Sequence, residues 1–135
     1  MEIAAARPPP INPNYAGSYI LLGDAKIIID DYESAAFNFK KAITLNSKSK
    51  SASVAYAHLC WLKYKSRNMN DAVKNCNKAL EINPKNSFAL DTRGAIKHYI
   101  GDRDGACIDY KNACTNGYKK REKYLASEAG EWCKN

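Results

Sequence analysis

The chain has 135 residues, of which 21 are lysine or arginine and 14 are aspartate or glutamate, giving a net charge of +7. This length suits one domain with no separate catalytic domain, and a hydrophobic share of 45% is too high for a disordered chain. No apolar run approaches the roughly 18 residues of a membrane span, and the opening MEIAAARPPP lacks the blocks of a secretion signal, so we expect a cytoplasmic protein without a membrane span.

Residues 1–14 differ in composition from the rest of the chain, because they contain Pro8, Pro9, Pro10 and Pro13. Proline runs favour an extended polyproline conformation and do not form helices. This segment is therefore predicted to be a Pro-rich N-terminal tail or linker.

From residue 15 to residue 117 the sequence predicts three helical hairpins, at about 16–49, 53–86 and 87–117. Each contains two stretches with apolar residues three and four positions apart, the spacing of one helical face, separated by turn and capping residues. Four columns of residues recur at intervals of 37 and then 34: Gly23, Cys60 and Gly94; Ala35, Ala72 and Ala106; Phe39, Cys76 and Tyr110; Ala42, Ala79 and Ala113. Such a repeat is typical of stacked arrays, in which no hairpin can bury its apolar face alone.

Residues 118–135 show one more helical pattern, with an apolar side and a basic side. The apolar side carries Tyr118, Leu125, Ala129 and Trp132, and the basic side carries Lys119, Lys120, Arg121 and Lys123. A stacked array needs a helix of this kind to cover its last open surface. We therefore predict that this segment is a C-terminal capping helix.

At these columns the chain resembles the tetratricopeptide repeat (TPR) family. The second unit carries the resemblance best, through Tyr56, Leu59, Cys60, Ala72, Cys76, Ala79, Leu80, Ile82 and Pro84. In the first unit Ser47 replaces the usual proline, and in the third Arg93 replaces the usual leucine. The resemblance implies an all-α, right-handed superhelix of three hairpins plus a capping helix. Within the family, Arg93 with Gly94 and the run GACIDY look most like cyanobacterial and related bacterial members.

The residues that could carry chemistry point away from catalysis. There is no glycine-rich phosphate loop, no GxSxG or HExxH motif, and His58 and Cys60 would point to different sides of a helix. Five cysteines without a CxxC motif argue for a reducing compartment, and Cys60 and Cys76 occupy core columns where cysteine acts as a small hydrophobe. We therefore expect no enzyme, no cofactor and no metal site, and folding without a disulfide.

The basic residues do not predict nucleic-acid binding. They are spread along outer faces and loops, except for the cluster from Lys119 to Lys123, and no RNA-binding motif accompanies them. A solvated helix face explains this cluster, and contact with an acidic partner or a membrane surface is the alternative.

In the TPR family the first helix of each hairpin lines a concave surface, so the resemblance implies a protein-binding groove here. The candidate groove residues are Ile20, Asp24, Ile27, His58, Trp61, Tyr64, Lys65, Phe88, Asp91, His98 and Tyr99. Exposed aromatic side chains on a rigid surface are typical of binding sites. We predict Trp61, Tyr64, Phe88 and Tyr99 as anchors for an apolar peptide or helix, with Asp91, Lys65 and His98 setting its orientation.

Other interpretations remain open at this point. The same surface could serve self-association into a homo-oligomer, it could be covered by the Pro-rich tail or by a second copy, or the chain could be a fragment of a larger regulatory protein. Family members that grip acidic chaperone tails use lysine, asparagine and arginine on these helices. The corresponding positions here hold Ile20, Asp24, His58, Phe88 and Thr92, so that role is not expected.

Overall fold

The computed structural model describes residues 15–134, and every regular element in that range is helical. The predicted tail at residues 1–14 lies outside the described residues. The helices are α1 (Ala16–Ile28), α2 (Tyr32–Leu45), α3 (Lys50–Lys65), α4 (Met69–Ile82), α5 (Ser87–Tyr99), α6 (Arg103–Thr115) and α7 (Lys119–Ala126), followed by the 3-10 helix η2 (Glu128–Cys133). The predicted all-α fold is confirmed.

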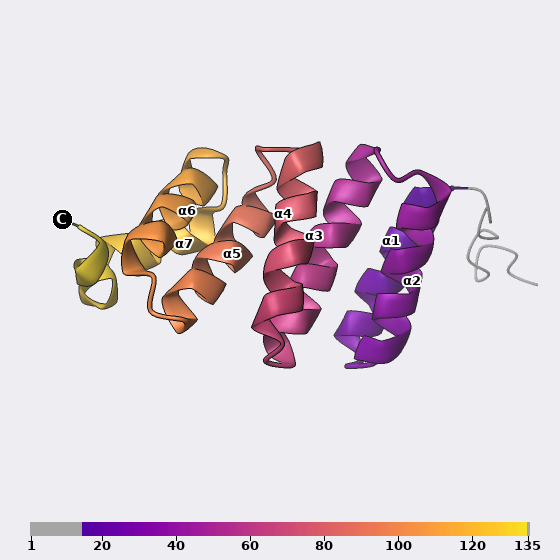
Figure 1. Cartoon of the computed structure of the whole chain (residues 1–135), viewed down its shortest axis with the longest axis horizontal. Coiled ribbons are helices and arrows are strands. Elements are labelled where there is room, and N and C mark those ends of the chain that lie inside the picture. Colours follow the sequence, from indigo (N-terminus) through magenta and orange to yellow (C-terminus); the bar gives the residue numbers. More distant parts are fainter. Residues whose placement is uncertain (1–14, 135) are drawn as a thin grey trace, which may run out of the picture.

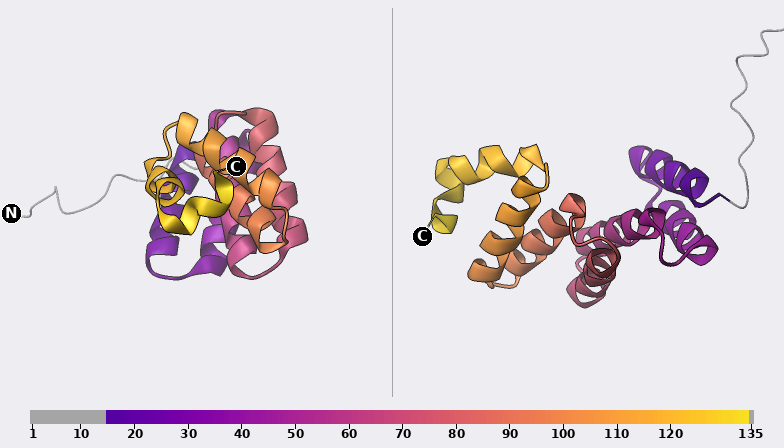
Figure 2. Two further views of the ribbon diagram at one scale, coloured as in Figure 1. Left: turned by 90° about the vertical axis from the view of Figure 1, so that its left-hand side faces the viewer. Right: turned by 90° about the horizontal axis from the view of Figure 1, so that it is seen from above.

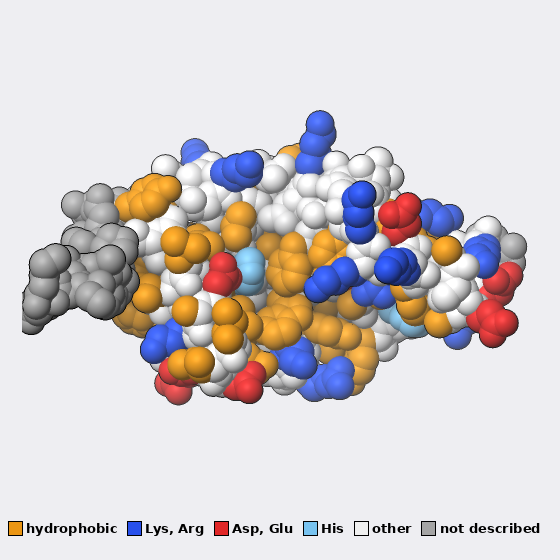
Figure 3. All heavy atoms as spheres, turned by 180° about the vertical axis from the view of Figure 1, so that it is seen from behind, with side chains coloured by type: hydrophobic (Ala, Val, Ile, Leu, Met, Phe, Trp, Pro, Cys, Tyr) orange, Lys and Arg blue, Asp and Glu red, His pale blue; other side chains and the backbone are white. Residues whose placement is uncertain are grey.

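The helices pair in order along the chain and stack into a row (Figure 1). Helices α1 and α2, α3 and α4, and α5 and α6 form hairpins, and α2 packs on α3 as α4 packs on α5. Seen from above, the row is curved, with α1 and α2 at one end and α7 and η2 at the other (Figure 2). The array therefore has a concave side, which is the side viewed in Figure 3.

The turns inside the three hairpins share one backbone conformation. Asp30, Arg67 and Gly101 stand at equivalent positions and have φ angles of 60°, 65° and 91°, in the left-handed region. The next residue but one starts the second helix, and Asp31, Asn68 and Asp102 cap these helices by accepting a hydrogen bond from a backbone N–H. The repeat in sequence is thus a repeat in local geometry.

The recurring columns of the sequence form the core. Ala35, Ala42, Ala72, Ala79, Ala106 and Ala113 are fully buried. A Cβ atom added to Gly23 would lie 2.5 Å from the ring of Phe39, and one added to Gly94 would lie 2.6 Å from the ring of Tyr110. The first and third hairpins therefore need glycine at this column, because an aromatic ring of the second helix fills the space.

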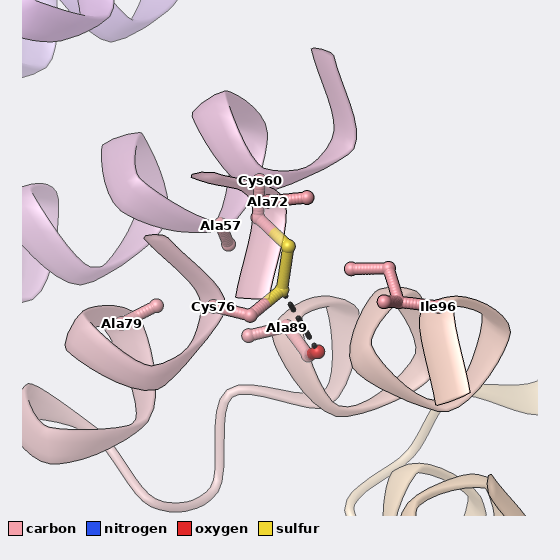
Figure 4. Packing of buried hydrophobic residues seen from close by; sticks show 7 residues of the cluster. All are labelled: Ala57, Cys60, Ala72, Cys76, Ala79, Ala89 and Ile96. Carbon is pink, nitrogen blue, oxygen red and sulfur yellow. Dashed lines mark hydrogen bonds between the residues drawn. A yellow bond between two sulfur atoms is a disulfide. The ribbon is translucent and has the colours of Figure 1, made fainter. Parts of the chain in front are cut away.

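In the second hairpin a disulfide bond takes the place of the contact between glycine and an aromatic ring. This corrects the expectation that no disulfide forms. Cys60 and Cys76 occupy the glycine and aromatic columns, and their Sγ atoms are bonded across a Cα–Cα distance of 5.2 Å (Figure 4). The physical reason is the close approach of the two helices at this column, which brings two cysteine side chains within bonding distance. The absence of a CxxC motif therefore did not predict whether a disulfide forms between these helices.

A second disulfide joins α6 to the C-terminal segment through Cys107 and Cys133, with a Cα–Cα distance of 5.4 Å. Cys114 is a free thiol. This segment also differs from the single predicted helix, because α7 ends at Ala126 and the backbone of the next residue, Ser127, is extended. Gly130 then approaches so closely that an added Cβ would lie 2.4 Å from the Tyr124 carbonyl oxygen, so the chain folds back onto α7 as η2.

Candidate protein-binding surface

His58 lies at the centre of the contact between the three hairpins. Its ring stacks on Phe39 with centroids 4.8 Å apart and faces Phe88 at 5.0 Å. Its Nδ1 lies 2.9 Å from the Val54 carbonyl oxygen, and its Nε2 lies 3.2 Å from Asp24 Oδ1. The structure thus brings the predicted residues Asp24, His58 and Phe88 together, where they connect α1, α3 and α5.

The N-terminal half of the concave surface is built on Trp61. Its ring meets Tyr32 edge-on at 5.8 Å, and the Lys65 ammonium lies 5.6 Å from the centroid of the same ring. Ile20 and Ile27 from α1 pack, like Trp61, against the core of the first hairpin while remaining partly exposed. These side chains offer apolar surface beside the Lys65 ammonium.

The C-terminal half contains a pocket of about 420 Å³, lined by Tyr64, Ala95, His98, Tyr99, Tyr110, Arg121 and Tyr124. The guanidinium of Arg67 lies 5.1 Å from the centroid of the Tyr99 ring, a favourable cation–π geometry. On this face hydrophobic side chains gather over the N-terminal and central hairpins, and lysine and arginine side chains lie over the C-terminal part (Figure 3). The surface therefore combines aromatic rings with positive charge.

Two predicted groove residues face the C-terminal cap instead of the open surface. Asp91 is buried and accepts hydrogen bonds from Arg121, whose Nε lies 2.7 Å from Oδ1. Burial alone would lower the pKa of Arg121, but the hydrogen bond and charge of Asp91 outweigh it, so the pKa is raised. The ring of His98 stacks on Trp132 with centroids 4.3 Å apart. Asp91 and His98 are therefore engaged by the cap, because α7 and η2 cover that end of the concave surface.

Sequence reasoning missed the residues that make this contact. Arg121 stands in the basic cluster attributed to a solvated face, yet its guanidinium carbon lies 4.0 Å from the centroid of the Tyr110 ring. Burial beside that contact raises the pKa of Tyr110 to about 12. Trp132 donates its indole N–H to the Tyr124 hydroxyl at 2.9 Å. No local pattern signals these pairs, since each joins residues of different elements.

Arg93, which replaces the usual leucine, belongs to a polar cluster around the buried Asp109 and not to the concave surface. Its Nε and Nη2 donate to the two carboxylate oxygens of Asp109, each at 2.8 Å, and its Nη1 donates to Asn77 at 3.0 Å. Lys97 adds an ion pair with Asp109 at 3.0 Å. The hydrogen bonds of Asp109 raise the pKa of Arg93. This cluster ties α4, α5 and α6 together without touching the candidate site.

Two further features concern metal binding and membrane insertion, and both statements apply to residues 15–134. Within that range no three histidine, cysteine, aspartate or glutamate side chains lie close enough together to hold a metal ion. No helix among residues 15–134 is long and apolar enough to cross a membrane.

Comparison with known proteins gives the family of this architecture. The tetratricopeptide repeat family model matches residues 16–49 and 54–86. Two crystal structures of MamA share 26% and 25% sequence identity with the chain, with TM-scores of 0.66 and 0.63, and cover 82% and 85% of it. The chain spans 63% and 58% of those two MamA chains.

A third solved structure is the first TPR domain of Spaghetti (RPAP3), bound to the HSP90 peptide SRMEEVD. It has 17% identity and a TM-score of 0.69, and the match covers 87% of this chain and 98% of that one. At this identity the match shows the fold alone. A search of curated protein sequences gives no significant match. With two repeats matched by the family model and the hairpins arranged as in these structures, the chain belongs to the tetratricopeptide repeat family.

Proposed function

We propose that this protein is a non-catalytic interaction module that binds a peptide or helix of a partner protein on the concave surface of α1, α3 and α5. The observation that carries the proposal is a set of apolar and aromatic side chains on packed helices that contact the core on one side and remain partly exposed on the other. Large apolar side chains in such places are typical of binding surfaces. Such a binding surface is sufficient for an adaptor or an assembly scaffold, which carries out no chemistry.

The anchors we propose are Trp61, Tyr64 and Tyr99, with Ile20 and Ile27 extending the apolar surface toward the N-terminal end. Tyr99 is 59% exposed and lies beside the pocket between α5 and α7. Lys65 is exposed and provides a charge that fixes the orientation of the bound segment.

Phe88, Asp91 and His98 have a supporting role in this proposal. Phe88 packs against His58, Asp91 binds Arg121, and His98 stacks on Trp132. Their substitution would change the shape of the surface by disturbing α7 and the contacts between hairpins, and would not simply remove a contact with the partner.

A neighbouring fold, the first TPR domain of RPAP3, is seen bound to an acidic HSP90 peptide. Peptide binding is therefore within the capacity of the fold, and function still depends on the side chains of the site. Here the positions that the family uses to clamp an acidic tail carry Ile20, Asp24 and Phe88. We accordingly propose a mainly apolar peptide or helix as the ligand, and not a chaperone tail.

The predicted cytoplasmic location rested in part on reduced cysteines. The two disulfides remove that ground, since disulfides persist in oxidising compartments. We therefore propose that the protein works in oxidising surroundings. The thiol state of the protein trapped directly from its cells with an alkylating reagent tests this proposal.

The experiment for the binding proposal places a photo-crosslinking amino acid at Tyr99 and, as a matched control, at Ile108. These two side chains have nearly the same exposure, 59% and 60%, but Ile108 lies on α6, away from the concave surface. We expect crosslinking of a defined partner from position 99 and none from position 108. Crosslinking to the chain itself, together with a mass that rises with concentration, would instead support self-association.

The purified partner then allows a titration. Trp61→Ala should weaken binding by at least about 2 kcal/mol, or roughly thirtyfold, as expected for a central anchor, while Ile108→Ala should leave affinity unchanged. Trp61 also packs against Tyr32, so affinity must be compared per folded molecule. Equal affinity of the two variants would contradict the proposal.

A further inference from the structure

The two disulfides of the chain differ in their surroundings. Cys60 and Cys76 are both 0% exposed, in the core between α3 and α4. The bond between Cys107 and Cys133 joins α6 to the C-terminal segment, and Cys107 is partly exposed. A thiolate must reach one of the two sulfur atoms to break a disulfide. The bond between α6 and η2 is therefore the more accessible of the two to a reductant.

The segment that this bond fastens depends on the array for its stability. Helix α7 has eight residues and none of them is buried, and an isolated helix of this length is not stable in water. The 3-10 helix η2 buries Gly130 and Cys133. Segments with little buried surface open more readily than the core of a protein, so the bond at Cys133 restrains an element that is otherwise weakly held.

The bond also fixes the position of the residue beside it. Trp132 precedes Cys133, and its ring stacks on His98 with centroids 4.3 Å apart. Its indole N–H donates to the Tyr124 hydroxyl at 2.9 Å. His98 and Tyr124 both line the pocket of about 420 Å³ on the concave surface. The disulfide thus holds a contact that positions two of the side chains that shape this pocket.

Packing of the repeat does not account for a cysteine at position 107. The corresponding residues of the first two hairpins are Ala36 and Val73, which are partly buried and pack against the cores of their hairpins. An apolar side chain is therefore sufficient for the repeat at this position. What cysteine adds at position 107 is the bond to η2.

We propose that the Cys107–Cys133 disulfide is a redox-controlled latch for the concave pocket, closed when oxidised and opened by a dithiol reductant. One thiolate of the reductant attacks Sγ of Cys107, and Cys133 leaves as a thiolate that takes up a proton. The second thiol of the reductant then attacks the mixed disulfide and becomes part of a cyclic disulfide, while Cys107 is released and takes up the other proton. Two electrons pass from the reductant to the protein.

Opening of the latch changes the pocket and leaves the stacked hairpins in place. Helix α7 stays attached near its start, where Arg121 binds α5, whereas η2 is released. Trp132 then leaves His98 and Tyr124, and the pocket loses its shape on that side. The effect on a partner rests on the proposed function: a segment bound at Tyr99 should bind the oxidised protein more tightly than the reduced one.

The experiment compares four forms of the full chain. These are the oxidised protein, the protein treated with dithiothreitol, the double serine variant Cys107→Ser/Cys133→Ser, and the control Cys114→Ser, which alters the free thiol on the same helix. The double serine variant leaves the buried Cys60–Cys76 bond intact, so it separates opening of the latch from loss of the core disulfide.

Two measurements follow the latch without any partner, so their outcome does not depend on the proposed function. Hydrogen exchange with mass spectrometry gives the protection of residues 122–133 and of α3. Nuclear magnetic resonance follows the indole N–H signals of the two tryptophans. Trp132 reports on the latch, and Trp61 on α3 serves as the internal reference.

We expect exchange in residues 122–133 to become at least tenfold faster, and the Trp132 signal to move, both on reduction and in the double serine variant. Protection of α3 and the Trp61 signal should stay unchanged, reoxidation should restore the first state, and Cys114→Ser should match the oxidised protein. Unchanged exchange in the double serine variant would overturn the proposal. Loss of protection throughout the array would also overturn it, because the bond would then be a general structural link.

Crosslinking from position 99 then measures the effect on binding. Its yield should fall at least fivefold in the double serine variant, and an equal yield in the oxidised protein and this variant would overturn the proposed regulation. If the exchange results are as expected and crosslinking is absent from every form, the latch is supported and the proposed function is contradicted.

Discussion

Replacing Cys60 and Cys76 by alanine should destabilise the protein markedly. The bond joins residues 16 apart, and closing a loop of about 15 residues stabilises a fold by about 3 kcal/mol through the entropy of the unfolded chain. Both side chains are also fully buried, so their removal leaves unfilled space between α3 and α4. We expect the free energy of unfolding to fall by at least about 3 kcal/mol.

The equivalence between hairpins predicts a rescue without any covalent bond. Cys60→Gly combined with Cys76→Phe rebuilds the pair formed by Gly23 and Phe39 in the first hairpin. Burying phenylalanine in place of alanine is worth about 3–5 kcal/mol, and glycine within a helix costs about 1 kcal/mol. The net gain of about 2–4 kcal/mol over the double alanine variant offsets most of the loss.

Urea denaturation followed by circular dichroism measures these differences. All proteins should carry Cys107→Ala and Cys133→Ala, so that Cys60–Cys76 is the one bond that a reductant can break. Dithiothreitol should then lower the stability of the parent and leave both double variants unchanged. Equal stability of the double alanine variant and the oxidised parent would contradict the first prediction, and a Gly and Phe variant no more stable than the alanine one would contradict the second.

Three further predictions concern other parts of the structure. Alkylation of the denatured, unreduced protein should modify Cys114 alone, and mass spectrometry showing several modified cysteines would contradict the two disulfides. Asp109→Ala leaves Arg93 and Lys97 without their buried partner and should cost about 3–5 kcal/mol of stability, whereas the exposed Asp104→Ala should be nearly neutral in the same melting assay. Burial raises the pKa of Tyr110 to about 12, above the value of about 10 for an unfolded tyrosine. The contribution of Tyr110 to stability should therefore be constant below about pH 10 and be lost as the pH rises from about 10 through 12, and a similar loss in Tyr110→Phe would show that another group is responsible.

Much of the fold follows from local patterns that the sequence alone displays. The columns at Gly23, Ala35, Phe39 and Ala42 recur in each hairpin and determined the pairing of helices, because close helix contact tolerates only small residues opposite a large one. The turns could also be predicted from the sequence, since capping residues such as Asp31 accept hydrogen bonds from backbone N–H groups only three residues away.

The same columns contained a signal for the first disulfide. Cys60 stands in the glycine column and Cys76 in the aromatic column, and these two columns face each other in the first hairpin, where Gly23 lies against Phe39. The number and spacing of the cysteines predicted no disulfide, because spacing along the chain does not give the distance across a hairpin.

Tertiary structure decided which residues of the candidate site are accessible to a partner. The resemblance to the TPR family placed Asp91 and His98 on the concave side, but whether they are open depends on a segment some 30 residues later in the chain, in which Arg121 binds Asp91 and Trp132 stacks on His98. Likewise, Leu21 is exposed, although the residue at the same position of the third hairpin, Thr92, is buried. A periodic sequence determines which face of each helix is apolar; what covers that face depends on which distant element packs there, and local periodicity carries no information about that.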